Sequence, residues 1–144
     1  MKGEKISKVL YPDFFNSDYI NAYIELNDEL KKLIDLSGYK DDFTRKIRNA
    51  LRMLENLKRN CTRQKTFERL TKNGDIYSIR LIGKKNIRIL FMFIDDCGRE
   101  VVILLYAFEE KDKKSKSKYS YNAAIDIAKN RINKILEWKE MQWC

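Results

Sequence analysis

The sequence contains no histidine, only one proline and only five glycines in 144 residues. Without histidine there is no His-based acid–base pair, no Ser-His-Asp triad and no His-ligated metal site. Any acid–base chemistry must therefore use tyrosine, lysine, arginine or a carboxylate. No linker, repeat or low-complexity segment divides the chain, so we expect a single domain over residues 1–144.

Cysteine is scarce as well, and the three cysteines are widely spaced without a CxxC pair: Cys61, Cys97 and Cys144. Such spacing predicts free thiols in a reducing cytosol. The acidic pair Asp95 and Asp96 stands in a turn-forming stretch and has no metal-ligand spacing behind it. We therefore expect no metal site and no other cofactor.

Long hydrophobic runs are also missing. The longest, at residues 89–94 and 101–108, are far shorter than the ~20 residues that a membrane span needs. The first ten residues, MKGEKISKVL, lack the apolar core of a signal peptide. These features predict a cytoplasmic protein without a membrane partner.

Positive charge is abundant instead. Lysine and arginine number 30 against 21 acidic residues, which gives a net charge of +9. Such an excess favours nucleic acid, an anionic membrane surface or an acidic protein as the partner.

The stretch from residue 76 to residue 108 dominates the pattern: IYSIRLIGKKNIRILFMFIDDCGREVVILLYAF. Its β-branched, aromatic and leucine residues favour strands, and the segments GKKN and DDCG favour turns. We expect three consecutive antiparallel strands. Arg80 and Arg88 interrupt two of them, and a charged side chain in a strand must reach solvent or a partner.

The strand register can be predicted from alternation. If residues 83–85 form the first turn, Arg80 lies opposite Arg88, and both guanidinium groups lie on one face of the sheet. The other face then carries only apolar and tyrosine side chains: Tyr77, Ile79, Leu81, Ile87, Ile89, Phe91 and Phe93. A slip of one residue would place Arg88 in this apolar layer. Two arginines in register repel each other, which favours a polyanionic ligand nearby.

Helical spacing flanks the strands. Apolar periodicity predicts a helix from about Ser17 that stops near Gly38, and a second helix that Asp41 or Asp42 caps, so that the pair covers about residues 17–59. A last helix is expected over about residues 120–139. The fold class is α+β: an N-terminal helical hairpin and a C-terminal helix packed on one side of a twisted, mainly antiparallel sheet of three to four strands.

Residues 67–131 resemble the RelE/ParE superfamily of bacterial toxins, most closely its phage-derived HigB-like branch. That branch shows LYELR, R-x-L-F, LLHGF-x-KK-x-x-K-x-P and a helix with A-x-x-R. The corresponding segments here are IYSIR at 76–80, RILF at 88–91, LLYAF at 104–108 with Lys111 and Lys114, and AKNR at 128–131.

This resemblance implies a toxin of a type II toxin–antitoxin system, an mRNA interferase that cleaves mRNA on the ribosome and inhibits translation. It implies a metal-independent endoribonuclease reaction in which a ribose 2′-hydroxyl attacks the adjacent phosphate. The implied partners are the ribosome, mRNA and a cognate antitoxin, expected to be a helix-turn-helix protein. By position, the catalytic candidates are Arg80, Arg88, Lys111 and Tyr119, and the candidate RNA contacts are Lys84, Lys85, Lys113, Lys114 and Tyr121.

The sequence departs from the branch at several positions. Tyr106 replaces the histidine of LLHGF, Glu110 the first lysine of the KK pair and Ser78 the glutamate of LYELR. The identity of the general base therefore stays open. Two other functions stay open as well: a ParE-like toxin that poisons gyrase by binding it, and a relative that binds RNA without cutting it. For Arg88, the alternative role is a structural ion pair with Asp95, Glu100 or the helix pair.

Overall fold

The structure is a computed structural model that describes residues 5–70, 75–111 and 116–142, with side chains left out for 116–120 and 140–142. Its centre is a six-stranded mixed sheet in the order β1-β2-β6-β5-β4-β3. The strands are β1 (Ile6–Ser7), β2 (Ile20–Tyr23), β3 (Phe67–Arg69), β4 (Tyr77–Leu81), β5 (Ile87–Asp96) and β6 (Arg99–Glu109). The helices are α1 (Leu26–Asp35), α2 (Lys40–Leu57) and α3 (Lys116–Gln142), and a 3₁₀ helix, η1 (Lys58–Arg63), follows α2.

The predicted meander is present as β4, β5 and β6, and its register is as expected. Arg80 is the Cα partner of Arg88, and Leu81 is the partner of Ile87. All seven residues of the predicted apolar face are buried in one core layer: Tyr77, Ile79, Leu81, Ile87, Ile89, Phe91 and Phe93. Alternation along β4 and the position of Arg88 in β5 were sufficient to predict this register, since a slip would have placed Arg88 in the apolar layer that contains Phe91.

The α+β class is confirmed, but the expectation of three to four strands is wrong. Three short strands add to the meander, and β2 runs parallel to β6 while the other pairs are antiparallel. The four residues of β2 are all buried, and a strand covered on both faces shows no alternation. Ile20, Tyr23 and Ile24 therefore imitate helical spacing, and the predicted helix start at Ser17 is wrong.

Ser17 still has a local role in the backbone. Its hydroxyl accepts hydrogen bonds from the backbone N–H groups of Tyr19 and Ile20, each 3.0 Å long. The helix begins only at Leu26, and α2 begins at Lys40 with Asp41 and Asp42 in its first turn rather than at its cap. Helix α3 begins at Lys116, four residues before the expected start.

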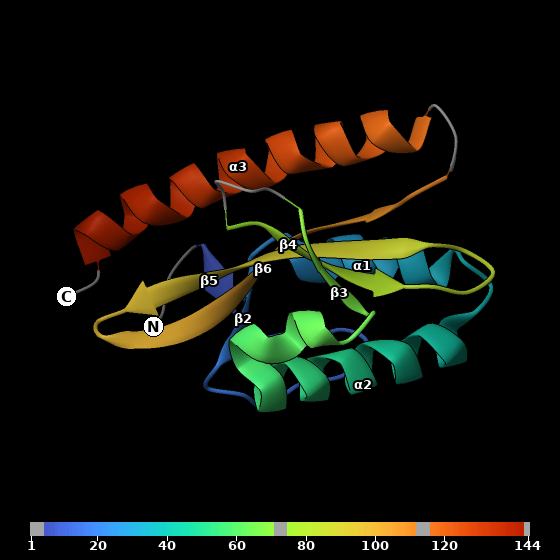
Figure 1. The fold of residues 1–144 in the computed structure, drawn as a ribbon, viewed down its shortest axis with the longest axis horizontal. Coiled ribbons are helices and arrows are strands. Elements are labelled where there is room, and N and C mark those ends of the chain that lie inside the picture. The colour runs from blue at the N-terminus through green and yellow to red at the C-terminus, as the bar shows by residue number, and fades with distance from the viewer. Residues whose placement is uncertain (1–4, 71–74, 112–115, 143–144) are drawn as a thin grey trace.

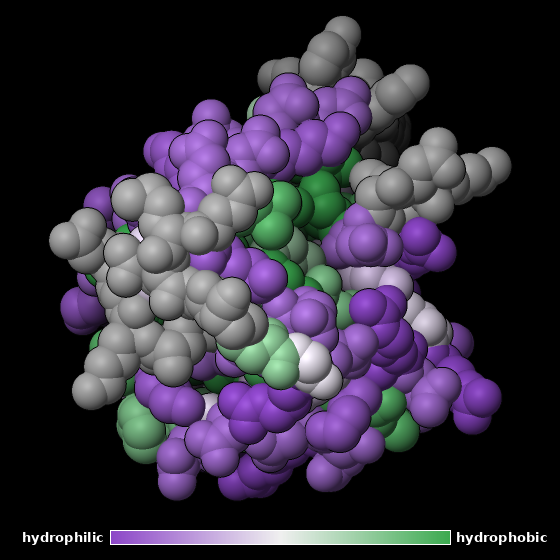
Figure 2. All heavy atoms as spheres, turned by 90° about the vertical axis from the view of Figure 1, so that its left-hand side faces the viewer, coloured by the Kyte–Doolittle hydropathy of each residue, from purple (hydrophilic) through white to green (hydrophobic). Residues whose placement is uncertain are grey.

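The helices lie on both faces of the sheet, which corrects the expectation of helices on one side (Figure 1). Side chains of α1 and α2 join the layer that contains Phe91, and those of α3 join a second layer that contains Leu90 and Met92. Strand β6 contributes to both layers, so its apolar character on both faces is explained. Figure 2 shows apolar side chains at the surface in a band directly below α3.

Two further observations complete the fold. No helix among the described residues is both long enough and apolar enough to cross a membrane. Cys97 is disulfide-bonded, so the prediction of three free thiols is wrong at this residue. Cys61 is a free and fully buried thiol, and Cys144 lies outside the described residues.

Candidate functional site

Arg88 is the centre of a small polar cluster on the α3 face of the sheet. Its Nε donates a hydrogen bond of 2.9 Å to the hydroxyl of Tyr121 on α3. Its Nη2 lies 2.9 Å from the Glu110 carboxylate, just past the end of β6. The side chains of Arg88 and Glu110 are 9% and 11% exposed, so this ion pair is buried. Charge-assisted bonds of this kind hold the guanidinium plane in a fixed orientation.

Two polar atoms in this cluster are not satisfied. The Nη1 of Arg88 and the Oγ of Ser78 are buried and have no hydrogen-bond partner among the described residues. Buried polar groups are nearly always paired, so each exception requires an explanation in terms of function or of a bound molecule. Ser78 and Arg88 lie on neighbouring strands and share the α3 face of the sheet.

Burial raises the pKa of Tyr121, and the nearby Ser78 hydroxyl and the positive charge of Arg88 oppose this rise. The phenol is therefore protonated at neutral pH. Because the bond with Arg88 uses the oxygen of Tyr121 as acceptor, it leaves the hydroxyl proton free for donation elsewhere. The cluster thus brings together a cation, a carboxylate and a neutral hydroxyl in the absence of histidine.

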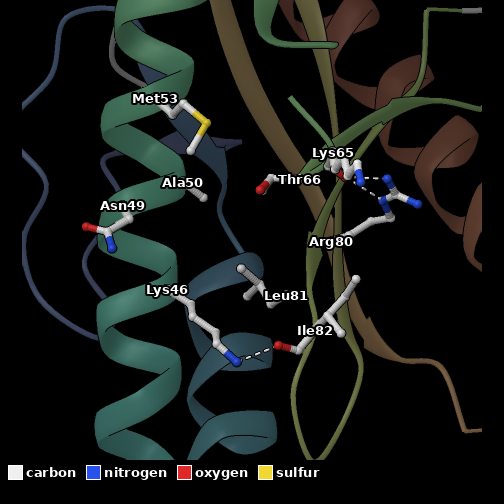
Figure 3. Close-up of a pocket in the computed structure, with 9 residues that line it drawn as sticks. All are labelled: Lys46, Asn49, Ala50, Met53, Lys65, Thr66, Arg80, Leu81 and Ile82. Carbon is white, nitrogen blue, oxygen red and sulfur yellow. Dashed lines mark hydrogen bonds between the residues drawn. The ribbon is translucent and has the colours of Figure 1, made fainter. Parts of the chain in front are cut away.

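Arg80 has a different environment, although it lies directly across the ladder from Arg88. Its Nε and Nη2 both donate to the backbone carbonyl of Lys65, and no carboxylate among the described residues pairs with it. It lies at the rim of a groove of about 350 Å³ between α2 and β4. Figure 3 shows its guanidinium next to Lys65 and directed away from α2, so the charged group does not point into the groove.

A second depression, of about 360 Å³, collects three lysines from separate parts of the chain. Lys32 comes from α1, Lys85 from the turn between β4 and β5, and Lys111 from the segment after β6. None of them forms an ion pair with a described residue. The side chains of Leu33 and Tyr106 add apolar surface to the same depression. Glu109 lines the same depression and offsets one of these charges, so the lining keeps an excess of positive charge that suits an anionic ligand.

The sequence-predicted site residues therefore fall into separate places. Arg88 and Tyr121 are brought together, and Lys85 and Lys111 line the second depression, while Arg80 lies at the groove. Lys84 is exposed at the tip of its turn. Lys113 and Lys114 lie outside the described residues, and Tyr119 lies in α3 without a described side chain.

Arg88 does form an ion pair inside the structure. Its partner is Glu110, not one of the acidic residues that the sequence analysis considered. Sequence reasoning noted Glu110 only as a departure from a lysine of the family pattern. It overlooked the possibility that the Glu110 carboxylate neutralises the charge of Arg88. Because the two residues are 22 positions apart, only the pairing of β5 with β6 brings them together.

A second residue that sequence reasoning left without a role is Arg131 on α3. Its side chain is 10% exposed and contacts Glu29 of α1, Glu25 at the N-cap of α1 and the backbone carbonyl of Leu105. The guanidinium also lies over the ring of Tyr106, 5.1 Å from its centroid. Burial would lower the pKa of Arg131, but the glutamates outweigh this effect and raise it. Arg131 therefore ties α3 to α1, although the two helices lie on opposite faces of the sheet.

Among the residues that the structure describes, no group of three or more His, Cys, Asp or Glu side chains could hold a metal ion. The acidic side chains near the β5–β6 turn instead form ion pairs: Asp96 with Arg99, and Glu100 with Arg59.

Comparison with known proteins gives no match to a family model, a curated protein or a solved structure. A functional proposal for this chain therefore depends on the geometry of its own side chains.

Proposed function

We propose that this protein is a metal-independent endoribonuclease of the RelE/HigB type that cuts mRNA on the ribosome. The observation that carries the proposal is the cluster of Arg88, Glu110 and Tyr121, in which one guanidinium nitrogen is unpaired. The net charge of +9 and the lysines of the second depression support an RNA partner.

The cluster offers a group for each step of 2′-hydroxyl attack. Glu110 is the carboxylate that would accept the proton of the ribose 2′-hydroxyl as its oxygen bonds to phosphorus. Arg88 would stabilise the added negative charge on the phosphorane. Tyr121 would donate its proton to the 5′-oxygen as the P–O5′ bond breaks, leaving a 2′,3′-cyclic phosphate. Because Nη1 of Arg88 is buried, the reaction requires RNA binding to uncover this nitrogen.

The same burial favours a second candidate function, an RNA-binding protein that does not cut. Glu110 neutralises Arg88 inside the protein, whereas Arg80 and the three lysines of the second depression form no ion pair with a residue that the structure describes, and Glu109 offsets only part of the charge of that depression. In this case the affinity for RNA depends on Arg80 and the lysines, and the Arg88 cluster only stabilises the fold.

Primer extension in a bacterial translation extract, with and without ribosomes, separates these functions. We expect ribosome-dependent cuts with the wild-type chain and their loss in Arg88→Gln and Tyr121→Phe, with Arg99→Gln as the surface control. Salt-dependent RNA binding without cuts would replace the proposal with the second candidate. Growth arrest without RNA binding or cuts would contradict both and indicate a protein target such as gyrase.

A further inference from the structure

The outer side of α2 presents a stripe of polar and basic side chains. Arg45, Asn49, Arg52 and Asn56 recur at spacings of four, three and four residues, which places them on one side of the helix. All four are exposed, and the buried stripe of α2 lies on the opposite side. Figure 3 shows this for Asn49, whose amide is directed away from β4. The stripe therefore faces solvent along about 17 Å of helix.

The 3₁₀ helix η1 extends this basic surface. Residues 56–67, NLKRNCTRQKTF, contain four cations and no acidic residue. Figure 1 shows η1 beside the C-terminal part of α2, and the fully buried Cys61 anchors it in the core. The side chains of Arg63 and Lys65 are exposed. We call the exposed residues of α2 and of segment 58–65 the α2–η1 surface.

Most of the positive charge of this surface is not neutralised within the protein. Arg45 does pair with a carboxylate, that of Asp42. By contrast, the side chains of Arg52, Arg63 and Lys65 form no ion pair and no hydrogen bond with a residue that the structure describes. These three cations remain available to an anionic partner.

The α2–η1 surface contains no apolar anchor. None of the large apolar side chains that are exposed among the described residues lies between residues 40 and 81. Aromatic side chains typically hold the bases of a single strand, and buried aromatic or apolar anchors typically hold a protein partner. Phosphates and ribose hydroxyls require only cations and neutral polar groups such as asparagine, glutamine and threonine. The surface therefore suits a nucleic-acid backbone whose bases are already paired.

We propose that the α2–η1 surface binds the sugar–phosphate backbone of double-stranded RNA. Arg52 and Arg63 contact phosphates, and the amides of Asn49 and Asn56 exchange hydrogen bonds with phosphates and ribose 2′-hydroxyls. The wide, shallow minor groove of an A-form duplex presents these hydroxyls to a protein.

This inference rests on the proposed function only in that RNA is the partner, and it adds a second RNA surface. Helix α2 packs on the face of the sheet that contains Phe91, whereas the Arg88 cluster lies on the α3 face. A duplex held by α2 and η1 thus leaves the Arg88 cluster open to a separate single strand.

Fluorescence anisotropy with a fluorescein-labelled RNA duplex of about 20 base pairs tests the proposal, since such a duplex exceeds the span that one duplex-binding domain contacts. We expect Arg52→Gln/Arg63→Gln to lower the slope of log K against log salt by about 1.8, or about 0.9 for each lost phosphate contact. The affinity at 0.1 M salt should fall by about 10- to 60-fold. The same variant should bind the single strand of equal sequence within about twofold of wild type, because single strands have no stacking platform on this surface.

Two further variants separate specific contacts from net charge. Asn49→Ala/Asn56→Ala should weaken duplex binding about fivefold with an unchanged salt slope, because it removes neutral hydrogen bonds only. Lys129→Gln/Lys134→Gln removes two charges from exposed positions of α3 and is the matched control. Because all the substituted residues are exposed, thermal unfolding should be the same for each variant and wild type.

Equal losses in Arg52→Gln/Arg63→Gln and in the α3 control overturn the inference, as do equal losses for duplex and single strand. Displacement of the duplex by polyglutamate as readily as by unlabelled duplex also overturns it, and indicates an acidic protein as the partner. Cleavage in the translation extract is scored separately. Cuts without duplex binding leave the proposed nuclease standing alone, and duplex binding without cuts leaves the α2–η1 surface standing alone.

Discussion

Arg80 and Arg88 are Cα partners across β4 and β5, yet one charge is neutralised and the other is not. Arg88 pairs with the buried carboxylate of Glu110, whereas the one partner of the Arg80 guanidinium among the described residues is the backbone carbonyl of Lys65. The repulsion expected between two arginines in register is thus reduced by Glu110 on one side alone. One cross-strand pair thus provides both a surface cation, Arg80, and a buried cation in a polar cluster, Arg88.

The buried ion pair predicts a strong effect on stability. Arg88→Met should lower the free energy of unfolding by about 3–5 kcal/mol, because it leaves the carboxylate of Glu110 buried without a partner. Arg88→Met/Glu110→Leu should recover at least half of this loss, since both charges are then removed. Urea denaturation measures the difference, with Arg99→Met as the exposed control. Equal stability of the single and double variants would show that Glu110 is not the partner.

Tyr121→Phe separates chemistry from folding. Loss of a general acid should lower the rate of RNA cleavage about 10²- to 10⁴-fold, measured in the translation extract at saturating protein. The free energy of unfolding should fall by about 1–3 kcal/mol at most, because Arg88 Nε loses its acceptor. Tyr39→Phe, at a 41% exposed tyrosine, is the control. An unchanged cleavage rate would remove Tyr121 from the mechanism.

The second depression predicts a change in salt dependence. In Lys85→Gln/Lys111→Gln the slope of log K for single-stranded RNA against log salt should fall by about 1.4, because two lysines no longer neutralise RNA phosphates. Lys129→Gln/Lys134→Gln removes the same charge from exposed positions of α3 and serves as the control. Equal slopes for the two double variants would show that the depression only contributes net charge.

Arg131 should be important for the docking of α3. Arg131→Met removes the partner of Glu29 and the donor to the Leu105 carbonyl, and should lower the free energy of unfolding by about 3 kcal/mol. Hydrogen exchange should quicken in α3 first, because this side chain ties the helix to α1. Lys129→Met, two residues away on the exposed side of α3, should change stability by less than about 0.5 kcal/mol. Unchanged exchange in α3 would contradict the assignment.

Cys61 predicts a loss of stability at alkaline pH. Burial raises the pKa of its thiol from 9.0 to about 11. Above pH 9 the unfolded chain loses this proton while the folded protein keeps it, so stability is complete below pH 9 and declines up to about pH 11. The contribution amounts to about 2–3 kcal/mol. Since several tyrosines with raised pKa act in the same direction, the measurement is the difference between wild type and Cys61→Ala across this range. Parallel curves would contradict it.

The sequence by itself determined the meander and its register. The alternation over Tyr77–Leu81 and the position of Arg88 in the next strand leave only one pairing that keeps both arginines out of the layer that contains Phe91. The stripe of α2 was equally clear, because Phe43, Ile47 and Leu54 recur at helical spacing and are all buried. These are local patterns, in which the period of the side chains directly reports the element.

The tertiary structure decided everything that depends on distant pairing. Strand β2 was hidden because its burial on both faces removes alternation, and only its parallel pairing with β6 reveals it as a strand. The face that a helix covers also depends on contacts between distant segments. All helices were expected on one face of the sheet, although α3 covers the other. The partner of Arg88 could not be read from the chain, since Glu110 becomes its neighbour only when β5 and β6 align. A charged residue in a strand indicates that a partner or solvent must be near. Which residue becomes that partner depends on the tertiary structure.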